Sequence, residues 1–116
     1  MELFAHCLGA LLLVNSLPHL VHGVCGYEFP TPFARPRAVG LSAPRTNVLW
    51  GGANFVAACA LLLGVGDFGF GANVDTVAVF AVGAAAALLI SASAGRSRRA
   101  REASSGDASY GIRRAS

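Results

Sequence analysis

Five polar side chains interrupt two apolar stretches of this chain, and their types could support chemistry. Asn15, His19 and His22 follow one another at intervals of four and three residues, and Asn47 and Asn54 are seven residues apart. Residues spaced in this way share one face of a helix. An imidazole or a carboxamide in an apolar environment is costly unless it forms hydrogen bonds or binds a ligand. These five residues therefore form the candidate site.

Three interpretations of this polar face are open. The first is structural, because the two faces could hydrogen-bond to each other and hold two helices together, with roughly 0.5–2 kcal/mol from each bond. In the second, His19 or His22 is an axial ligand of haem or binds another metal ion, although the second stretch offers no carboxylate or thiolate at that depth. The third is a proton or solute path, since histidine titrates near neutral pH. The structural interpretation is favoured, because no acidic partner lies within these stretches.

Three apolar stretches must position these residues. They cover about residues 3–24, 47–66 and 77–94, and each approaches the ~20 residues that cross a ~30 Å hydrocarbon core as a helix. Hydrophobic residues make up 54% of the 116 residues and charged residues only 13%, more apolar surface than a soluble domain of this size can bury. None of the stretches alternates with the period of a strand. We therefore predict an all-α membrane protein with three transmembrane helices, which form one domain over residues 1–95.

Positive charge is confined to two segments. All nine basic residues are arginines; three lie between the first two stretches and six follow residue 95, whereas the connection at 67–76 carries Asp67 and Asp75. Basic segments stay in the cytoplasm during insertion. The pattern predicts an inner-membrane protein with its N-terminus outside and its C-terminus in the cytoplasm. Cys7 and Cys59 then share the outer half, where a disulfide is conceivable but free thiols are favoured.

The arginine-rich segment 96–116 is also rich in Ser, Ala and Gly, and it is predicted to be a disordered cytoplasmic tail. Its first four arginines are expected to contact anionic lipid headgroups: Arg96, Arg98, Arg99 and Arg101. No aromatic residues alternate with these arginines as in a nucleic-acid-binding segment. Membrane lipids are therefore the expected partners of the tail, and nucleic acid is not.

Aromatic and proline residues dominate the first connection, at Phe29, Pro30, Pro32 and Phe33. The prolines hold this segment extended, and aromatic rings are typical of the headgroup layer. We expect an interfacial cytoplasmic loop, with docking of a partner protein as the alternative. Pro44 suits the first turn of the second helix, with Ser42 as its cap.

Three motifs occur together in the first half of the chain: Asn15-Ser16-x-Pro18-His19-x-x-His22-Gly23, Phe29-Pro30-Thr31-Pro32-Phe33 and Ser42-x-Pro44-x-x-Asn47-x-x-Trp50-Gly51. Over residues 10–54 this pattern resembles a group of small bacterial integral membrane proteins. The resemblance implies a bacterial membrane protein in which the polar faces and the aromatic-proline loop form one unit. It implies no particular activity.

The expected function follows from what the membrane stretches carry. Catalysis is not expected, because no nucleophile–base pair and no pair of acids lies at a shared depth. We expect a non-enzymatic accessory or interaction subunit that associates with itself or with a larger membrane complex, without a resident cofactor or metal. The alternative is a small transporter, or a haem- or ion-handling protein, that uses His19 and His22.

The predicted orientation determines how reporters fused after Ser116 should behave. A periplasmic reporter such as alkaline phosphatase should be inactive there, because arginine-rich segments remain in the cytoplasm. A fluorescent reporter that folds only in the cytoplasm should be active at the same position. Phosphatase activity of the fusion in whole cells would contradict the orientation.

Overall fold

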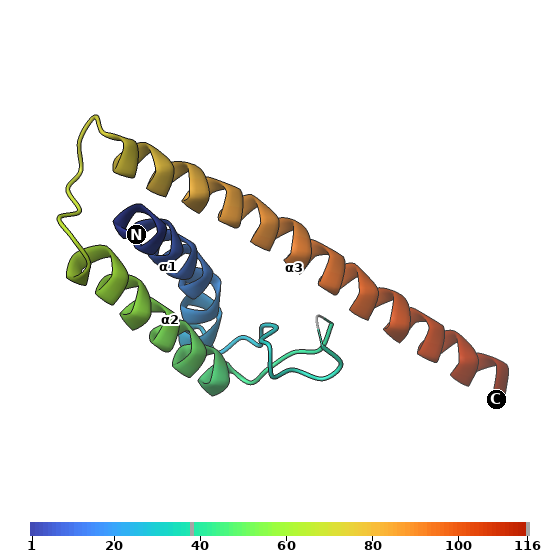
Figure 1. Cartoon of the computed structure of the whole chain (residues 1–116). Helices are drawn as coiled ribbons and strands as arrows, with labels where there is room; N and C mark the ends of the chain where they lie inside the picture. The colour runs from blue at the N-terminus through green and yellow to red at the C-terminus, as the bar shows by residue number, and fades with distance from the viewer. Residues whose placement is uncertain (38, 116) are drawn as a thin grey trace.

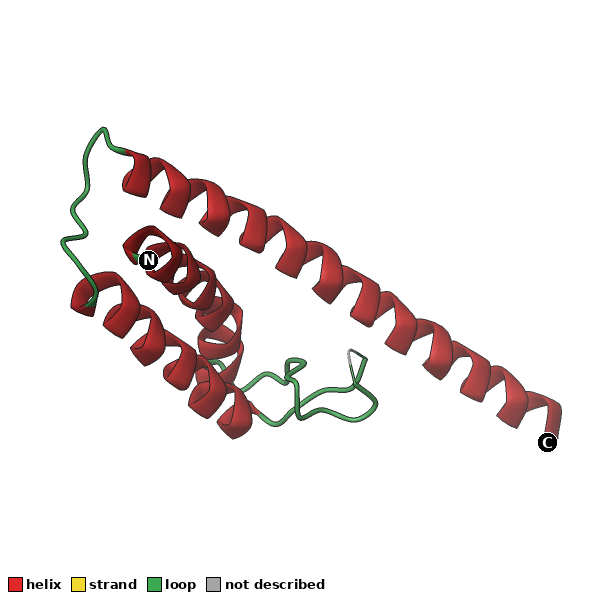
Figure 2. Ribbon diagram, in the orientation of Figure 1, coloured by secondary structure: helices red, strands yellow, loops and turns green. Residues whose placement is uncertain are grey.

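The chain folds into three helices joined by two loops. A computed structural model describes residues 1–37 and 39–115, with α1 at Glu2–Val24, α2 at Pro44–Gly64 and α3 at Val74–Ala115 (Figure 1). The described residues contain no strand (Figure 2). Each helix is long and apolar enough to cross a membrane. The predicted all-α, multi-pass membrane architecture is confirmed.

Local sequence explains where α2 and α3 begin. Pro44 occupies the first position of α2, where its missing N–H costs nothing. The predicted cap by Ser42 is wrong, because the residue before α2 is Ala43 and the Ser42 hydroxyl bonds to Thr31 instead. At the start of α3 the Asn73 side-chain oxygen accepts a hydrogen bond from the Thr76 amide at 2.8 Å, the geometry of a capping residue.

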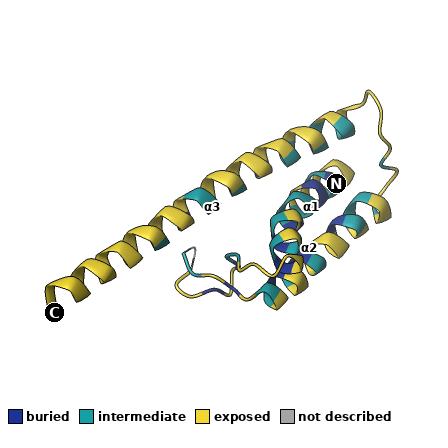
Figure 3. Cartoon of the chain, turned by 180° about the vertical axis from the view of Figure 1, so that it is seen from behind, coloured by how far each residue is buried: buried dark blue, intermediate teal, exposed yellow. Residues whose placement is uncertain are grey.

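The helices pack in a row with α1 in the middle. In the described part of the chain, α1 contacts both other helices, whereas α2 and α3 do not pack against each other (Figure 1). Buried residues gather on α1 and α2, and α3 is exposed along almost all of its length (Figure 3). The polar face is thus enclosed mainly by the α1–α2 pair.

Glycines allow the backbones of α1 and α2 to approach closely. A methyl group at Gly51 would lie 2.9 Å from the backbone nitrogen of Leu20, and one at Gly23 would lie 2.8 Å from the backbone nitrogen of Val48. Backbone atoms cannot move aside as a flexible side chain can. Small residues are typical of such contacts between membrane helices, and here they set the separation across which His19 and Asn47 meet.

The prediction of a disordered tail over residues 96–116 is wrong as far as Ala115, because α3 continues through this segment without a break at residue 95. The segment extends a helix that has already formed, so it bears no nucleation cost. It contains no proline. The Arg98 and Glu102 side chains approach to 3.4 Å one turn apart, and the Arg114 guanidinium lies 5.3 Å from the centre of the Tyr110 ring. These contacts add to a helix that sequence composition alone does not indicate.

The close approach at Gly51 gives a prediction with a matched control. Gly51→Ala should lower the free energy of unfolding by about 1–3 kcal/mol, because the new methyl group overlaps the α1 backbone. Gly52→Ala should leave stability unchanged or raise it by up to ~1 kcal/mol, since that position has open space and alanine favours a helix. SDS-induced unfolding of the purified chain measures both. Equal stabilities of the two variants would contradict the close packing.

Candidate functional site

Asn47 is the centre of the candidate site, and it is completely buried. Its side-chain nitrogen donates hydrogen bonds to the carbonyl oxygens of Phe29, Ser42 and Ala43 at 2.9, 3.1 and 3.2 Å. Its side-chain oxygen lies 2.7 Å from Nδ1 of His19. One side chain therefore connects α1, α2 and the loop between them, which we call the α1–α2 loop (residues 25–43).

The surroundings of Asn47 determine the tautomer of His19. Three carbonyl oxygens can only accept, so they fix the Asn47 nitrogen on their side and its oxygen on the side of His19. Nδ1 of His19 must then carry the hydrogen, and the neutral ring keeps its lone pair at Nε2. His19 is 5% exposed, and its ring lies nearly perpendicular to that of Phe29, with ring centroids 5.2 Å apart. The ring is held in one orientation with one acceptor nitrogen.

The remaining polar residues of the site divide into two arrangements. The Asn15 side-chain nitrogen lies 3.5 Å from the Asn54 oxygen, a long interhelical contact, while the Asn54 nitrogen donates to the Trp50 carbonyl at 2.8 Å. His22 does not join this group. Its Nδ1 donates to the Pro18 carbonyl at 2.8 Å on its own helix, and its ring packs on Phe29 with centroids 4.4 Å apart.

The α1–α2 loop folds over the end of the helix pair. Phe29 and Ser42 exchange two backbone hydrogen bonds of 3.1 and 3.3 Å, and the buried hydroxyls of Thr31 and Ser42 lie 2.5 Å apart. Phe29 therefore belongs to the site, whereas Phe33 is 63% exposed and stacks edge-on against Trp50. Pro30 and Pro32 lie between them and line a cavity. Sequence reasoning missed Thr31 and Ser42 as site residues, because two hydroxyls eleven residues apart give no periodic signal.

A cavity of about 350 Å³ lies beside this polar cluster. Both helices of the pair, the loop and α3 contribute to its wall, which combines hydroxyl, amide and imidazole groups with rings and aliphatic side chains. The lining residues are Asn15, His19, Phe29, Pro30, Thr31, Pro32, Trp50, Ile90, Ser93, Ala94 and Ser97. His19 thus has one ring nitrogen committed to Asn47 while its ring borders an open space.

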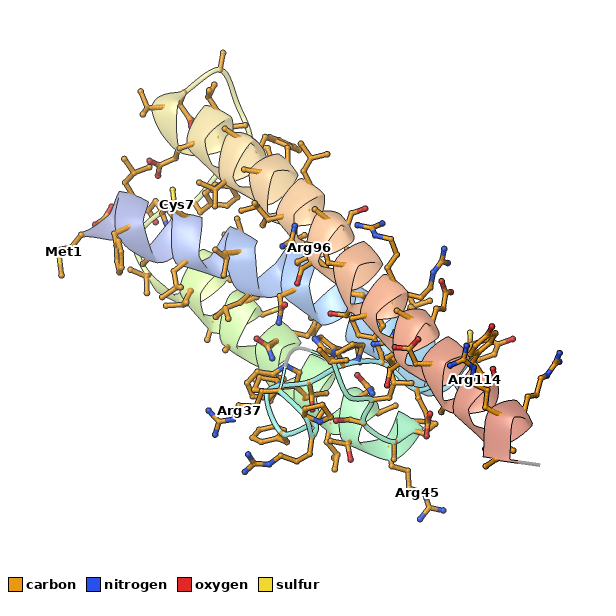
Figure 4. All side chains as sticks on the ribbon, turned by 90° about the vertical axis from the view of Figure 1, so that its right-hand side faces the viewer. Met1, Cys7, Arg37, Arg45, Arg96 and Arg114 are labelled. Atoms are coloured by element: carbon orange, nitrogen blue, oxygen red, sulfur yellow. The ribbon has the colours of Figure 1, made fainter. Side chains whose placement is uncertain are left out.

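The four arginines predicted to meet lipid headgroups lie along α3. Arg96, Arg98 and Arg99 are exposed, whereas Arg101 is half-buried and donates to the Val39 carbonyl of the α1–α2 loop at 2.7 Å. Figure 4 shows Met1 and Cys7 toward one end of the molecule and Arg45 and Arg114 toward the other. Cys7, Cys25 and Cys59 are free thiols.

A second polar cluster, at the end of the bundle that carries the N-terminus, was not predicted. His6 is completely buried, with Nδ1 2.9 Å from the Asp75 carboxylate and Nε2 2.6 Å from the Val65 carbonyl. The sequence signal is an acid next to an apolar stretch, but the expected connection at 67–76 places Asp75 in a loop. In the structure it lies in the first turn of α3. Among the described residues, no three His, Cys, Asp or Glu side chains are arranged so that they could hold a metal ion.

Comparison with known proteins adds no evidence about function, so the geometry of the candidate site is the evidence that remains. No family model, curated protein or solved structure matches the chain. The resemblance to small bacterial membrane proteins therefore stays a prediction.

The hydrogen bonds of Asn47 give a prediction for the site. Asn47→Ala should lower the free energy of unfolding by about 3 kcal/mol, because it leaves His19 and loop carbonyls without partners in a buried region. Asn54→Ala, which removes one long interhelical contact, should cost about 1 kcal/mol. Hydrogen exchange of the Phe29 and Ser42 amides should also accelerate in the Asn47 variant alone. Equal effects of the two substitutions would contradict a central role for Asn47.

Proposed function

We propose that this chain is a non-enzymatic accessory or interaction subunit of a bacterial inner membrane, with its N-terminus outside and its C-terminus in the cytoplasm. The α1–α2 pair and its loop form a rigid anchor, and α3 provides the surface that meets a partner. The confinement of all nine arginines to the α1–α2 loop, the start of α2 and the second half of α3 supports the orientation.

The observation that carries this proposal is the exposure of α3. Among the helices of the described chain it packs on α1 alone, and large apolar side chains lie exposed along it, among them Phe80, Leu88 and Leu89 with 64%, 73% and 70% exposure. Ala81 and Ala85 lie four residues apart on exposed positions, a spacing that lets another helix approach closely. Gly83, in contrast, faces α1, because a methyl group added there would lie 3.5 Å from the Val14 side chain. The Ala81–Ala85 face is thus open to a second membrane helix.

The second half of α3 suits contact with the membrane surface. Arg96, Arg98 and Arg99 are exposed where the apolar part of the helix ends, and each arginine near an anionic leaflet contributes roughly 1 kcal/mol. Arg101 is engaged by the α1–α2 loop, which ties this part of α3 to the anchor. The partner is a second copy of the chain or a helix of a larger complex, in a membrane with anionic lipids.

Photo-crosslinking in native membranes tests the proposal. A photoreactive amino acid in place of Leu89 on α3 should give a discrete protein adduct, because this face is proposed to meet a partner helix. The same substitution at Leu63, which is 77% exposed on α2, serves as the matched control and should react with lipid. The mass of the adduct separates a homo-oligomer from a larger complex. Lipid adducts alone at both positions would contradict the proposal.

The cavity beside His19 favours a second candidate function, a small transporter or a ligand-handling protein. The Nε2 of His19 can accept a hydrogen bond from an N–H or O–H group of a ligand, or can itself coordinate haem or a metal ion. Phe29 and Trp50 also line the cavity, and their rings can pack against the apolar part of a ligand. His22 is committed to Pro18 through Nδ1 and does not line this cavity. A small molecule that copurifies with the native chain but not with His19→Ala would favour this alternative.

A further inference from the structure

His6 lies where three elements converge at the end of the bundle that carries the N-terminus. The histidine comes from α1, the carbonyl of Val65 from the residue that follows α2, and the carboxylate of Asp75 from the first turn of α3. Phe68 packs against the imidazole with ring centroids 5.1 Å apart. The histidine has no exposed surface, whereas the Asp75 side chain is 32% exposed. The cluster is therefore closed on the histidine side and open to water at the carboxylate.

The hydrogen bonds of His6 determine how many protons the cluster holds. The Val65 carbonyl can only accept, so Nε2 must carry a hydrogen. The contact between Nδ1 and Asp75, at 2.9 Å, requires one further proton. That proton lies either on Nδ1 of an imidazolium that faces a carboxylate, or on a carboxylic acid that faces a neutral imidazole. In both cases His6 and Asp75 together hold it.

We propose that His6 and Asp75 form a proton-binding site that fastens α3 to α1. Loss of the shared proton to water leaves a nitrogen lone pair facing a carboxylate oxygen, and this contact is repulsive. The pair then separates, and Asp75 turns toward solvent. A lower pH does not break the contact. An imidazolium, which carries hydrogens on both Nδ1 and Nε2, still donates a hydrogen bond to the carbonyl oxygen of a protonated Asp75. The contact between His6 and Asp75 therefore holds α3 against α1 at low pH and breaks as the pH rises.

The charges around the pair are predominantly negative. Glu2 on α1 lies against Gly66, where an added methyl group would fall 2.6 Å from its carboxylate. Asp67 follows in the same loop, and Asp75 is the acid contributed by α3. The Met1 amino group is the cation supplied by this end of α1, since all arginines belong to the α1–α2 loop, to α2 or to the segment after residue 95. No arginine is therefore positioned by the chain to replace His6 as the partner of Asp75.

Opening at this site acts on α3 because Asp75, in the first turn of that helix, is bound to α1 through His6. Among the helices of the described chain, α3 packs on α1 alone, and toward its opposite end the Arg101 guanidinium donates a hydrogen bond to the Val39 carbonyl. Separation of His6 from Asp75 frees the first turns of α3 and the loop at 65–73, while α1 and α2 stay paired. The attachment of α3 to α1 through this pair does not require the proposed partner.

Distance measurements between spin labels test the proposal. Phe4→Cys on α1 and Val77→Cys on α3, both at exposed positions, would carry nitroxide labels in a chain whose native cysteines are replaced by alanine, in lipid nanodiscs. The short, narrow distance distribution expected at pH 5 should give way to longer distances as pH rises to 10. Above the ordinary imidazole pKa of about 6.5, opening is coupled to release of one proton, so the ratio of open to closed molecules should grow by up to about tenfold for each pH unit there and stay nearly constant below it.

Two substitutions decide whether the pair is responsible. In Asp75→Asn the amide can donate to neutral His6, so the labels should stay close at every pH. Asp67→Asn, the control, should keep the pH response of the parent chain. A parent chain with the same distances from pH 5 to 10, or an Asp75→Asn chain that opens with pH as the parent does, would overturn the proposal.

Discussion

A buried carboxamide must satisfy every one of its hydrogen-bonding groups, and this constraint on Asn47 organises half of the molecule. In an apolar environment an unpaired amide costs more than a hydrogen bond contributes. Asn47 meets the requirement only when the α1–α2 loop presents its carbonyls on one side and His19 stands on the other. The glycine contacts between the helices bring the two side chains within reach. The fold of the loop, the helix pairing and the tautomer of His19 therefore depend on one another.

The third helix is held in a different way. It contributes few buried residues, rests on α1 through small side chains, and has a polar tie near each end, at Asp75 and at Arg101. Burial between apolar helices contributes little when lipid is equally apolar. Attachment of α3 therefore depends on these polar contacts, since α3 lacks the close glycine packing that also joins α1 and α2. This asymmetry makes α3 the element best suited to meet a partner and to respond to protonation.

The sequence predicts those features of the structure that depend on residues close together in the chain. The lengths of the apolar stretches predict all three candidate membrane-spanning helices. The spacing of four polar residues predicts that α1 and α2 carry polar faces at similar depth in the membrane: Asn15, His19, Asn47 and Asn54. It does not reveal that Asn47 binds the loop, because its acceptors are backbone carbonyls that only the folded loop brings together. The pair of His6 and Asp75 joins residues 69 positions apart. The helix over residues 96–115 was not predicted, because amino-acid composition describes that segment in isolation. In the structure the segment continues α3.

The energetic coupling between His19 and Asn47 tests the central claim most directly. A double-mutant cycle with His19→Ala, Asn47→Ala and the double variant, measured by SDS-induced unfolding, isolates the interaction between these two side chains. We expect a coupling energy of about 1–3 kcal/mol, because either substitution alone strands the other group in a buried region. Additive effects of the two substitutions would show that the bond does not organise the site, and would contradict the account.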